Sequence, residues 1–304
     1  MQFAPILTKA RTLRNFCHVG DYGAARAMTE AGLNQQQCLY DRGTDTYWVR
    51  ELDLYLPPKH HNLLEHLWLV AALKEAGVSL TNCGPEIVAD AGAFNVALGT
   101  LEEFILLYEI LAQGVYNVVP CRQSSIVLDI GMNVGLASLH FAAQPWVEAV
   151  WSYEPVPATY ARALRNLERN PALAARITPH NFGLSDAADK MTFDYCSQWA
   201  AAVGVSGLNA EFRRSHEIAE SDISTVTVDV QDVRAAIRDV RARHPQAQVM
   251  VKIDCEGAEY AIMAALGSAG RTILAGFAYP LHGPARCGSS GCDPAGSICC
   301  TRWS

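Results

Sequence analysis

The stretch VLDIGMNVGLASL, residues 127–139, is the strongest indication of the fold of this chain. It begins inside a continuous apolar run, SIVLDI at 125–130, of the kind that forms a buried strand of a parallel sheet. Two glycines come next, and the apolar segment at 135–143 then predicts a helix. A strand, a glycine-containing turn and a helix in this order are typical of α/β proteins that bind a nucleotide-like ligand.

The same alternation continues through the rest of the chain. It predicts an α/β fold whose sheet is doubly wound and mostly parallel, with ligands held at the carboxyl ends of the strands. Further strands are predicted at 149–155, 177–184, 190–195, 224–230, 248–254 and 272–280, and helices at 157–170, 230–243 and 258–266.

The apolar pattern divides the chain into three regions. Residues 1–120 are predicted to be mostly helical, with helices at 62–76 and 101–112, and to cover or dock on the next region. Residues 121–281 hold the alternating strands and helices and form the predicted ligand-binding domain. Residues 282–304 contain Gly, Ser, Pro and Cys in place of an apolar strand or helix, which predicts an atypical tail.

Composition and charge argue against several classes of protein. The formal net charge of −7 argues against a nucleic-acid-binding protein that relies on phosphate contacts, and no run of Lys or Arg suggests a basic patch. The apolar stretch at 67–73 is far too short to span a bilayer, and residues 1–15 lack the apolar core of a signal peptide. We therefore expect a cytoplasmic protein without a membrane span, whose six scattered cysteines are buried, reduced thiols.

The glycine turn predicts the kind of ligand. A dinucleotide site uses G-x-G-x-x-G so that the backbone can approach a pyrophosphate, but here Asn133 takes the place of the middle glycine, between Gly131 and Gly135. This suits S-adenosylmethionine, which has no phosphate, and Asp129 would favour its cationic sulfonium. Glu154 lies at the end of the next strand, where an acid accepts hydrogen bonds from both ribose hydroxyls. These five residues are the predicted core of a cofactor site.

Two other classes of function stay open. The first is an NAD(P)-dependent oxidoreductase or epimerase, which the missing G-x-G-x-x-G and the lack of a Tyr-x-x-x-Lys pair disfavour. The second is a non-catalytic binding protein that keeps a Rossmann-like sheet without its activity.

Four blocks of the sequence carry a resemblance to a known family: DIGMNVG, SYEPVPATYARALRNLERN, HNFGLSD and VKIDCEGAEYAIM. They are similar to the motifs D-I-G-A-N-x-G, E-P, L-S-D and K-I-D-V-E-G-A-E of the FkbM family of S-adenosylmethionine-dependent methyltransferases. The resemblance covers roughly residues 101–266. It implies a class I methyltransferase domain, a Rossmann-like fold, and O-methylation of a hydroxyl on a small-molecule acceptor such as a sugar or a polyketide-derived natural product. It does not identify the acceptor.

The block VKIDCEGAEY contains the predicted catalytic residues. A weakly nucleophilic hydroxyl needs a general base or a metal, and Asp254 at the end of a strand is the first candidate for the base, with Glu256 the second. Lys252 lies on the same face as Asp254 and is either catalytic or an ion-pair partner that holds the turn. Glu259 either belongs to the site or opposes the helix dipole. We expect no metal, because no third ligand is evident beside the two acids.

Each of the remaining candidate residues has both a functional and a structural interpretation. Ser185 and Asp186 contact the adenine or cap a turn, and Tyr116 contacts the cofactor or is a packing anchor. His180 reaches the site or lies in a surface loop, and His60 lies among too few partner ligands for a metal site.

Residues 282–304 end the chain in an unusual way. The resemblance implies two more strands after 272–280 and a Glu near a His, whereas the segment at 279–282 keeps only the His. The four cysteines of the tail have the spacing C-x4-C-x6-C-C, which lacks the paired C-x2-C of a zinc site. A zinc-binding tail, a disordered tail and a truncated or frame-shifted terminus all stay open, and we favour the last.

Overall fold

The computed structural model describes residues 4–117, 124–200, 213, 214, 218–255, 257–266, 274 and 275. The chain divides into two compact units, Met1–Gln113 and Gly114–Ser304.

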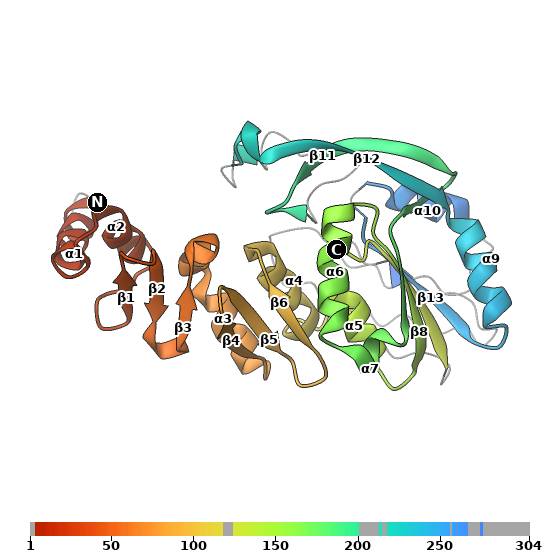
Figure 1. Cartoon of the computed structure of the whole chain (residues 1–304), viewed down its shortest axis with the longest axis horizontal. Helices are drawn as coiled ribbons and strands as arrows, with labels where there is room; N and C mark the ends of the chain where they lie inside the picture. The colour runs from red at the N-terminus through yellow and green to blue at the C-terminus, as the bar shows by residue number, and fades with distance from the viewer. Residues whose placement is uncertain are drawn as a thin grey trace. The chain divides into compact units, whose positions relative to one another are not determined.

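The first unit combines helices with two small antiparallel sheets (Figure 1). The sequence patterns predicted helices here and missed both three-stranded sheets, because strands of three to five residues are too short for alternation to stand out. The predicted helix at 62–76 is a 3₁₀ segment followed by an α-helix. In chain order the elements are α1 Ala4–Val19, α2 Tyr22–Glu30, β1 Cys38–Asp41, β2 Thr46–Val49, η1 Arg50–Leu52, β3 Leu54–Leu56, η2 Pro58–His66, α3 Leu67–Glu75, β4 Ser79–Cys83, β5 Glu86–Asp90, β6 Asn95–Leu98 and α4 Leu101–Leu111.

The second unit is built on a parallel sheet of five strands in the order β14-β13-β7-β8-β9. The chain runs outward from the central β7 through β8 to β9 and then returns to the other side of β7 as β13 and β14. The predicted doubly wound α/β fold is thereby confirmed, with its switch point between β7 and β13. The elements are β7 Ser125–Ile130, α5 Leu136–Ala143, β8 Val147–Tyr153, α6 Pro157–Glu168, α7 Pro171–Ala174, β9 Ile177–His180, α9 Val233–Arg243, β13 Gln248–Ile253, α10 Glu259–Leu266 and β14 Leu274–Ala275.

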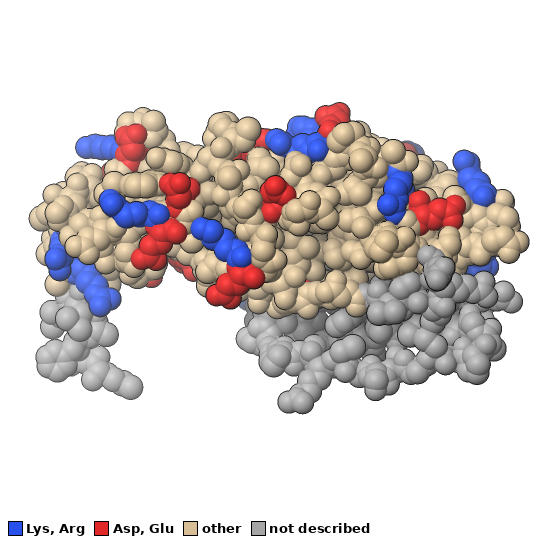
Figure 2. Space-filling model, turned by 90° about the horizontal axis from the view of Figure 1, so that it is seen from below, with Lys and Arg blue, Asp and Glu red and all other residues tan. Residues whose placement is uncertain are grey.

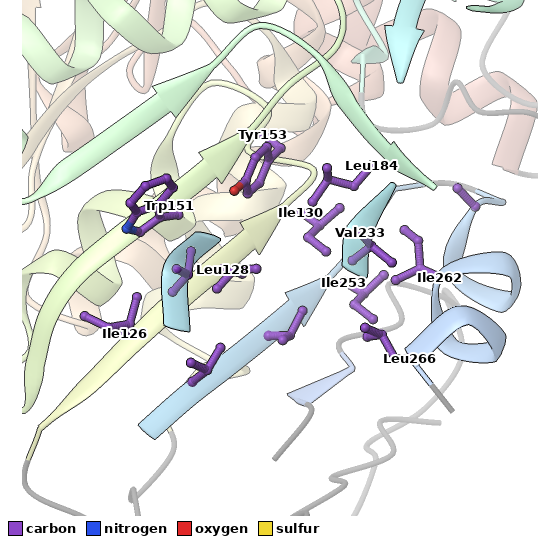
Figure 3. Close-up of a cluster of buried hydrophobic side chains, with 14 residues drawn as sticks. Ile126, Leu128, Ile130, Trp151, Tyr153, Leu184, Val233, Ile253, Ile262 and Leu266 are labelled. Atoms are coloured by element: carbon purple, nitrogen blue, oxygen red, sulfur yellow. The ribbon is translucent and has the colours of Figure 1, made fainter. Parts of the chain in front are cut away.

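Alternation along the strands explains which side chains meet which helices. Ile126, Leu128 and Ile130 of β7 share one buried cluster with residues of α9 and α10, and Figure 3 shows these side chains pointing into a common core. Asp129, one position out of phase, faces α5, where it meets Ser138. The polar residues of the central strands therefore gather on the α5 face and near the strand ends.

A second, three-stranded sheet has the order β10-β12-β11 and lies beside the main one in Figure 1. The sequence predicted one strand at 177–184, but the chain breaks after His180 and Gly183 starts β10, which pairs with β12 instead of β8. The Asn181 side chain donates to the backbone carbonyls of Glu154 and Pro155 at this break. The strands of this sheet are β10 Gly183–Ser185, β11 Asp189–Cys196 and β12 Ile223–Asp232, preceded by η4 Glu220–Asp222.

Several predictions concern residues whose structure is not described. These are the tail at 282–304 with its four cysteines, the segment at 279–282, and most of the strand predicted at 272–280, of which only Leu274–Ala275 is described as β14. Five of the six scattered cysteines are described, and their thiols are reduced; Cys38 and Cys196 are buried as predicted, but Cys17 and Cys83 are exposed. The sixth, Cys121, lies outside the described residues.

The surface and the helices bear on possible partners. On the face seen in Figure 2, basic and acidic side chains lie interspersed and neither sign forms a continuous area. Within the described ranges, every helix is too short or too polar to cross a membrane.

Candidate active site

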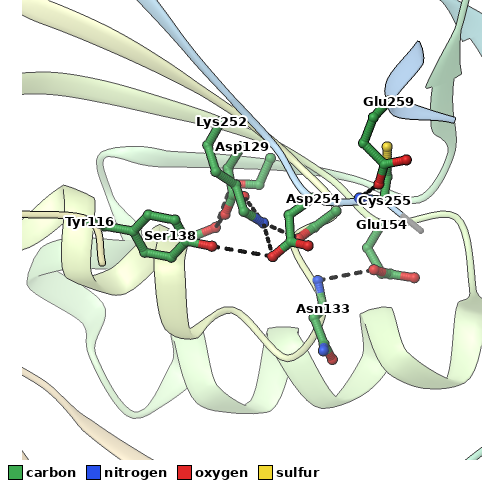
Figure 4. A network of polar contacts seen from close by, with 11 residues as sticks. Tyr116, Asp129, Asn133, Ser138, Glu154, Lys252, Asp254, Cys255 and Glu259 are labelled. Carbon is green, nitrogen blue, oxygen red and sulfur yellow. Dashed lines mark hydrogen bonds and ion pairs between the residues drawn. The ribbon is translucent and has the colours of Figure 1, made fainter. Parts of the chain in front are cut away.

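The candidate site lies where β7, β8 and β13 end. Strand register places Lys252 of β13, Asp129 of β7 and Ser152 of β8 side by side in one row across the sheet. All three are buried polar residues facing α5. Ser138 of α5 closes the row, with its hydroxyl 2.5 Å from Asp129 Oδ2 and 2.8 Å from Ser152 Oγ. The sheet thus carries a buried polar row directly below its carboxyl edge (Figure 4).

Lys252 joins the two turns that follow β7 and β13. Its Nζ lies 3.0 Å from Asp129 Oδ1 and 3.7 Å from Asp254 Oδ2, and it donates to the carbonyl of Gly131 at 2.6 Å. Burial alone would lower the pKa of Lys252, but the carboxylate of Asp129, supported by Asp254, holds that pKa above its ordinary value. The sequence predicted the ion pair with Asp254. The structure adds a shorter ion pair with Asp129, so Lys252 pairs with both acids.

Asp129 is the fully buried acid of the cluster. The prediction was that its negative charge favours a cationic donor, but its side chain is fully buried and Lys252 balances its charge. In this arrangement Asp129 and Ser138 hold Lys252 and the end of the sheet in place. A direct contact between Asp129 and a ligand stays a prediction with no support from this geometry.

Asp254 is the partly accessible member of the cluster. Its side chain is 19% exposed, whereas those of Lys252 and Asp129 are 4% and 0% exposed. Tyr116 donates its hydroxyl to Asp254 Oδ2 at 3.2 Å. Burial raises the pKa of Asp254 above its ordinary value, and the charge of Lys252 and the Tyr116 hydrogen bond oppose that shift. A carboxyl group with a raised pKa at a strand end is a reasonable general base.

The glycine turn packs against the β13 turn without space for side chains. Gly131 has φ +85°, and a Cβ built on it would lie 1.8 Å from the carbonyl oxygen of Asp254, so only glycine fits. The Asp254 N–H in turn donates to the carbonyl of Ile130 at 3.0 Å. Gly135, with φ +88°, precedes the first residue of α5. The turn and the candidate base therefore form one rigid unit.

Asn133 occupies the turn in an unusual state. Its φ is +50°, a conformation that asparagine tolerates better than most residues. Its side-chain Oδ1 and Nδ2 are shielded from solvent and have no hydrogen-bond partner among the described residues. Buried amides are nearly always hydrogen-bonded, so this group is available to a polar ligand group.

Glu154 connects the end of β8 to the glycine turn. Its carboxylate accepts the N–H of Asn133 at 3.0 Å and the N–H of Val156 at 2.9 Å. Burial raises the pKa of Glu154 to about 7, and the two backbone hydrogen bonds offset part of that rise. Four lone-pair positions on a carboxylate leave acceptor capacity beyond these two bonds. Two residues 21 positions apart in sequence thus form one site at the strand edge.

The rest of the VKIDCEGAEY block has a structural role where it is described. Glu259, the first residue of α10, accepts the N–H of Cys255 at 2.9 Å and of Gly257 at 2.6 Å. It therefore closes the turn before its own helix, in agreement with the helix-start interpretation. Glu256, the second predicted base, lies outside the described residues, and its role stays a prediction.

Three more predicted residues lie at or just after the ends of β9 and β10. Ser185 ends β10 and donates to Asp186 Oδ1 at 3.2 Å, while Arg234 binds the Asp186 carbonyl at 2.8 Å. An adenine contact for this pair stays a prediction. His180 stacks on Tyr153 with ring centroids 4.8 Å apart. Its backbone carbonyl accepts the N–H of Glu154 at 3.0 Å, and a contact of its ring with a ligand stays a prediction.

Sequence reasoning missed Ser138 and Ser152. Each is a small polar residue inside an apolar helix or strand, and nothing in the local pattern distinguishes it from a packing serine. Only the pairing register, which is a long-range property, shows that both face Asp129. Among the described residues no group of three or more His, Cys, Asp or Glu side chains is arranged to hold a metal ion.

Comparisons with known proteins show what this chain is similar to. Residues 129–277 match the model of the Methyltransferase FkbM domain. "Methyltransferase 1" of Beauveria bassiana is 25% identical over 60% of this chain and 74% of its own, and "Methyltransferase sdnD" of Sordaria araneosa is 26% identical over 61% and 77%.

A solved structure titled as a methyltransferase FkbM, from Methylobacillus flagellatus, is also similar. It is 15% identical, with a TM-score of 0.30, and the match covers 67% of this chain and 45% of that one. The family model and the two relatives confirm the resemblance read from the sequence blocks: residues 129–277 match the Methyltransferase FkbM domain, and the chain is similar to methyltransferases.

Proposed function

We propose that this methyltransferase uses S-adenosylmethionine to methylate a hydroxyl group of a small-molecule acceptor, a sugar or another natural product. The observation that carries the proposal is the contact between Glu154 and the backbone of Asn133. It sets a buried carboxylate beside the glycine turn, where the ribose of a nucleoside ligand needs an acceptor for its hydroxyls.

The residues present fit such a donor. Glu154 would accept the ribose hydroxyls, and the amide of Asn133, which has no hydrogen-bond partner among the described residues, would bind a polar group of the ligand. The Asn133 side chain also argues against a dinucleotide, whose pyrophosphate needs a bare backbone at this point. When bound, S-adenosylmethionine supplies a methyl group on a cationic sulfur as the electrophile.

Asp254 is the group that we assign to the acceptor. As the acceptor oxygen gains its methyl group, Asp254 takes the hydroxyl proton, and Lys252 stabilises the aspartate before the transfer. Because Gly131 and Asp254 are in direct backbone contact, the turn that binds the donor also fixes the position of the base. The reduced thiols of the described cysteines suit a reducing compartment, and we propose that the enzyme acts in the cytoplasm.

Equilibrium binding tests the proposal. Calorimetry on the full chain should show one site for S-adenosylmethionine and no site for NAD. Glu154→Ala should weaken binding of S-adenosylmethionine by about 10-fold or more, since it removes the acceptor of two hydrogen bonds. Asp254→Asn should leave binding within about 3-fold of the native value, because this residue is assigned to the acceptor.

The outcomes separate the candidate functions. Binding of NAD in preference to S-adenosylmethionine would replace the proposal by a dinucleotide enzyme. Binding of S-adenosylmethionine without methyl transfer to any member of a panel of sugars and polyketide alcohols would favour a non-catalytic binding protein. An Asp254→Asn variant with unchanged turnover on a methylated acceptor would remove Asp254 from the mechanism.

A further inference from the structure

We propose that Tyr116 is a positioning residue for Asp254: together with Lys252 it holds the oxygen Oδ2 and leaves Oδ1 to face the acceptor hydroxyl. This inference rests on the proposed function, because it assumes that Asp254 is the base. It concerns which of the two carboxylate oxygens acts, and which residue decides this.

Tyr116 is itself held firmly by the second unit. Its ring lies 5.3 Å from that of Phe141 on α5, and its backbone shares a hydrogen bond with His140. The Lys252 ammonium lies 6.0 Å from the centre of the ring, within the range of a cation–π contact. The hydroxyl is therefore brought to Asp254 by contacts that do not depend on Asp254, across 138 positions of sequence.

The two oxygens of Asp254 have different surroundings. Oδ2 receives the Tyr116 hydroxyl at 3.2 Å and lies 3.7 Å from Lys252 Nζ. Within the part of the chain that the structure describes, no residue donates a hydrogen bond to Oδ1, and Figure 4 shows Oδ1 pointing away from Tyr116 and Lys252. The side chain keeps 19% of its surface exposed, so the carboxyl group is partly accessible to a ligand.

The groups that face Asp254 determine whether its carboxyl group is charged or protonated. Lys252 and the Tyr116 hydroxyl favour the charged aspartate, whereas burial, Asp129 and Glu259 favour its protonated form. Burial holds the pKa of Tyr116 well above its ordinary value, so the hydroxyl keeps its proton and stays a donor throughout the working range of pH. Tyr116 thus keeps Asp254 able to accept a proton, and it does so through Oδ2 alone.

Carbon-13 NMR of the Asp254 carboxyl tests this without any acceptor. The full chain is labelled at the aspartate carboxyl carbons, and the Asp254 signal is assigned by its absence from Asp254→Asn. Tyr116→Phe should raise the titration midpoint of that signal by about one pH unit, the size expected when a charge-assisted hydrogen bond is lost. Tyr195→Phe is the matched control, because the buried Tyr195 hydroxyl shares a hydrogen bond with Thr159 at 3.1 Å and none with Asp254. The Asp254 midpoint in this variant should equal that of the native chain.

A second substitution covers the case in which Tyr116→Phe does not fold. Incorporation of 3-fluorotyrosine at position 116 keeps the hydroxyl and makes it a stronger donor, so the Asp254 midpoint should fall by a few tenths of a pH unit. A midpoint that does not move in either variant would overturn the positioning role. S-adenosylmethionine binding is measured in parallel on the same variants: its absence from the native chain would instead overturn the proposed function, whatever the carboxyl titration shows.

Discussion

The raised pKa of Glu154 makes ligand affinity depend on pH. The carboxyl group is buried and has a pKa of about 7, because the desolvation that raises it outweighs the N–H groups of Asn133 and Val156. Two ribose hydroxyls need two acceptors, which only the ionised carboxylate provides in full. A nucleoside ligand should therefore select the ionised form, release a proton on binding at neutral pH, and bind more tightly as pH rises.

The magnitude depends on the ionised fraction. With a pKa of about 7, roughly one tenth of Glu154 is ionised at pH 6 and roughly nine tenths at pH 8, which gives about a 10-fold gain in affinity, or about 1.4 kcal/mol. The effect on folding has the opposite sign. Because the folded pKa is above the ordinary one of 4.5, the contribution of Glu154 to stability is complete below about pH 4.5 and is lost as pH rises through about 7.

Calorimetry with 5′-methylthioadenosine isolates this effect. The ligand carries the adenosine but neither the amine nor the carboxylate of the full donor, so its own charge does not change near neutral pH. Titrations in two buffers of different ionisation enthalpy should show release of about half a proton at pH 7. Glu154→Gln cannot ionise and should bind with the same affinity at every pH. A native affinity that does not vary between about pH 6 and pH 8, or a Glu154→Gln variant with the native slope, would show that Glu154 ionisation does not control binding.

Three further predictions concern stability. Gly131→Ala should lower the free energy of unfolding in urea by well over the 1–2 kcal/mol expected of its left-handed backbone, because the new Cβ would meet a carbonyl oxygen at 1.8 Å. Gly135→Ala, whose Cβ would have no contact nearer than 3.4 Å, should lower it by about 1–2 kcal/mol, and equal losses would contradict this. Lys252→Met should destabilise the chain by about 3–5 kcal/mol by leaving Asp129 buried and unpaired, and Lys252→Met with Asp129→Leu should recover most of that loss; a double variant no more stable than the single one would disprove the pairing. His60 is buried, with no partner for either ring nitrogen among the described residues, and burial lowers its pKa to about 4. Hydrogen exchange of the peptide at 58–66, corrected for intrinsic rates, should therefore accelerate as pH falls from about 6.5 toward 4. His60→Leu should abolish that acceleration, and a variant that keeps it would exclude His60 as its source.

Much of the second unit could be predicted from local pattern. The strand at 125–130 has the predicted bounds because a strand buried on both faces is a continuous apolar run with sharp ends. The rule that parallel strands present their carboxyl ends on one edge was enough to bring Glu154 and Asp254 to the same side as the glycine turn. Resemblance to a family added the reaction class, which periodicity alone does not contain.

The rest depended on long-range register. Nothing local to Lys252 shows that it lies opposite Asp129, because a shift of one residue in the pairing of β13 with β7 would turn it to the other face of the sheet. The same holds for Ser152, and for Tyr116, whose hydrogen bond to Asp254 spans 138 positions of sequence. In the first unit, strands of three to five residues gave too little alternation to be recognised.

A crystal structure with S-adenosylhomocysteine bound is the sharpest test of the proposed site. We predict that the ribose hydroxyls lie within hydrogen-bond distance of Glu154, at the carboxyl edge of β7 and β8, and that Asp254 Oδ1 faces the sulfur side of the ligand with Oδ2 still on Tyr116. A ligand bound elsewhere, or a ribose that makes no contact with Glu154, would contradict the proposal.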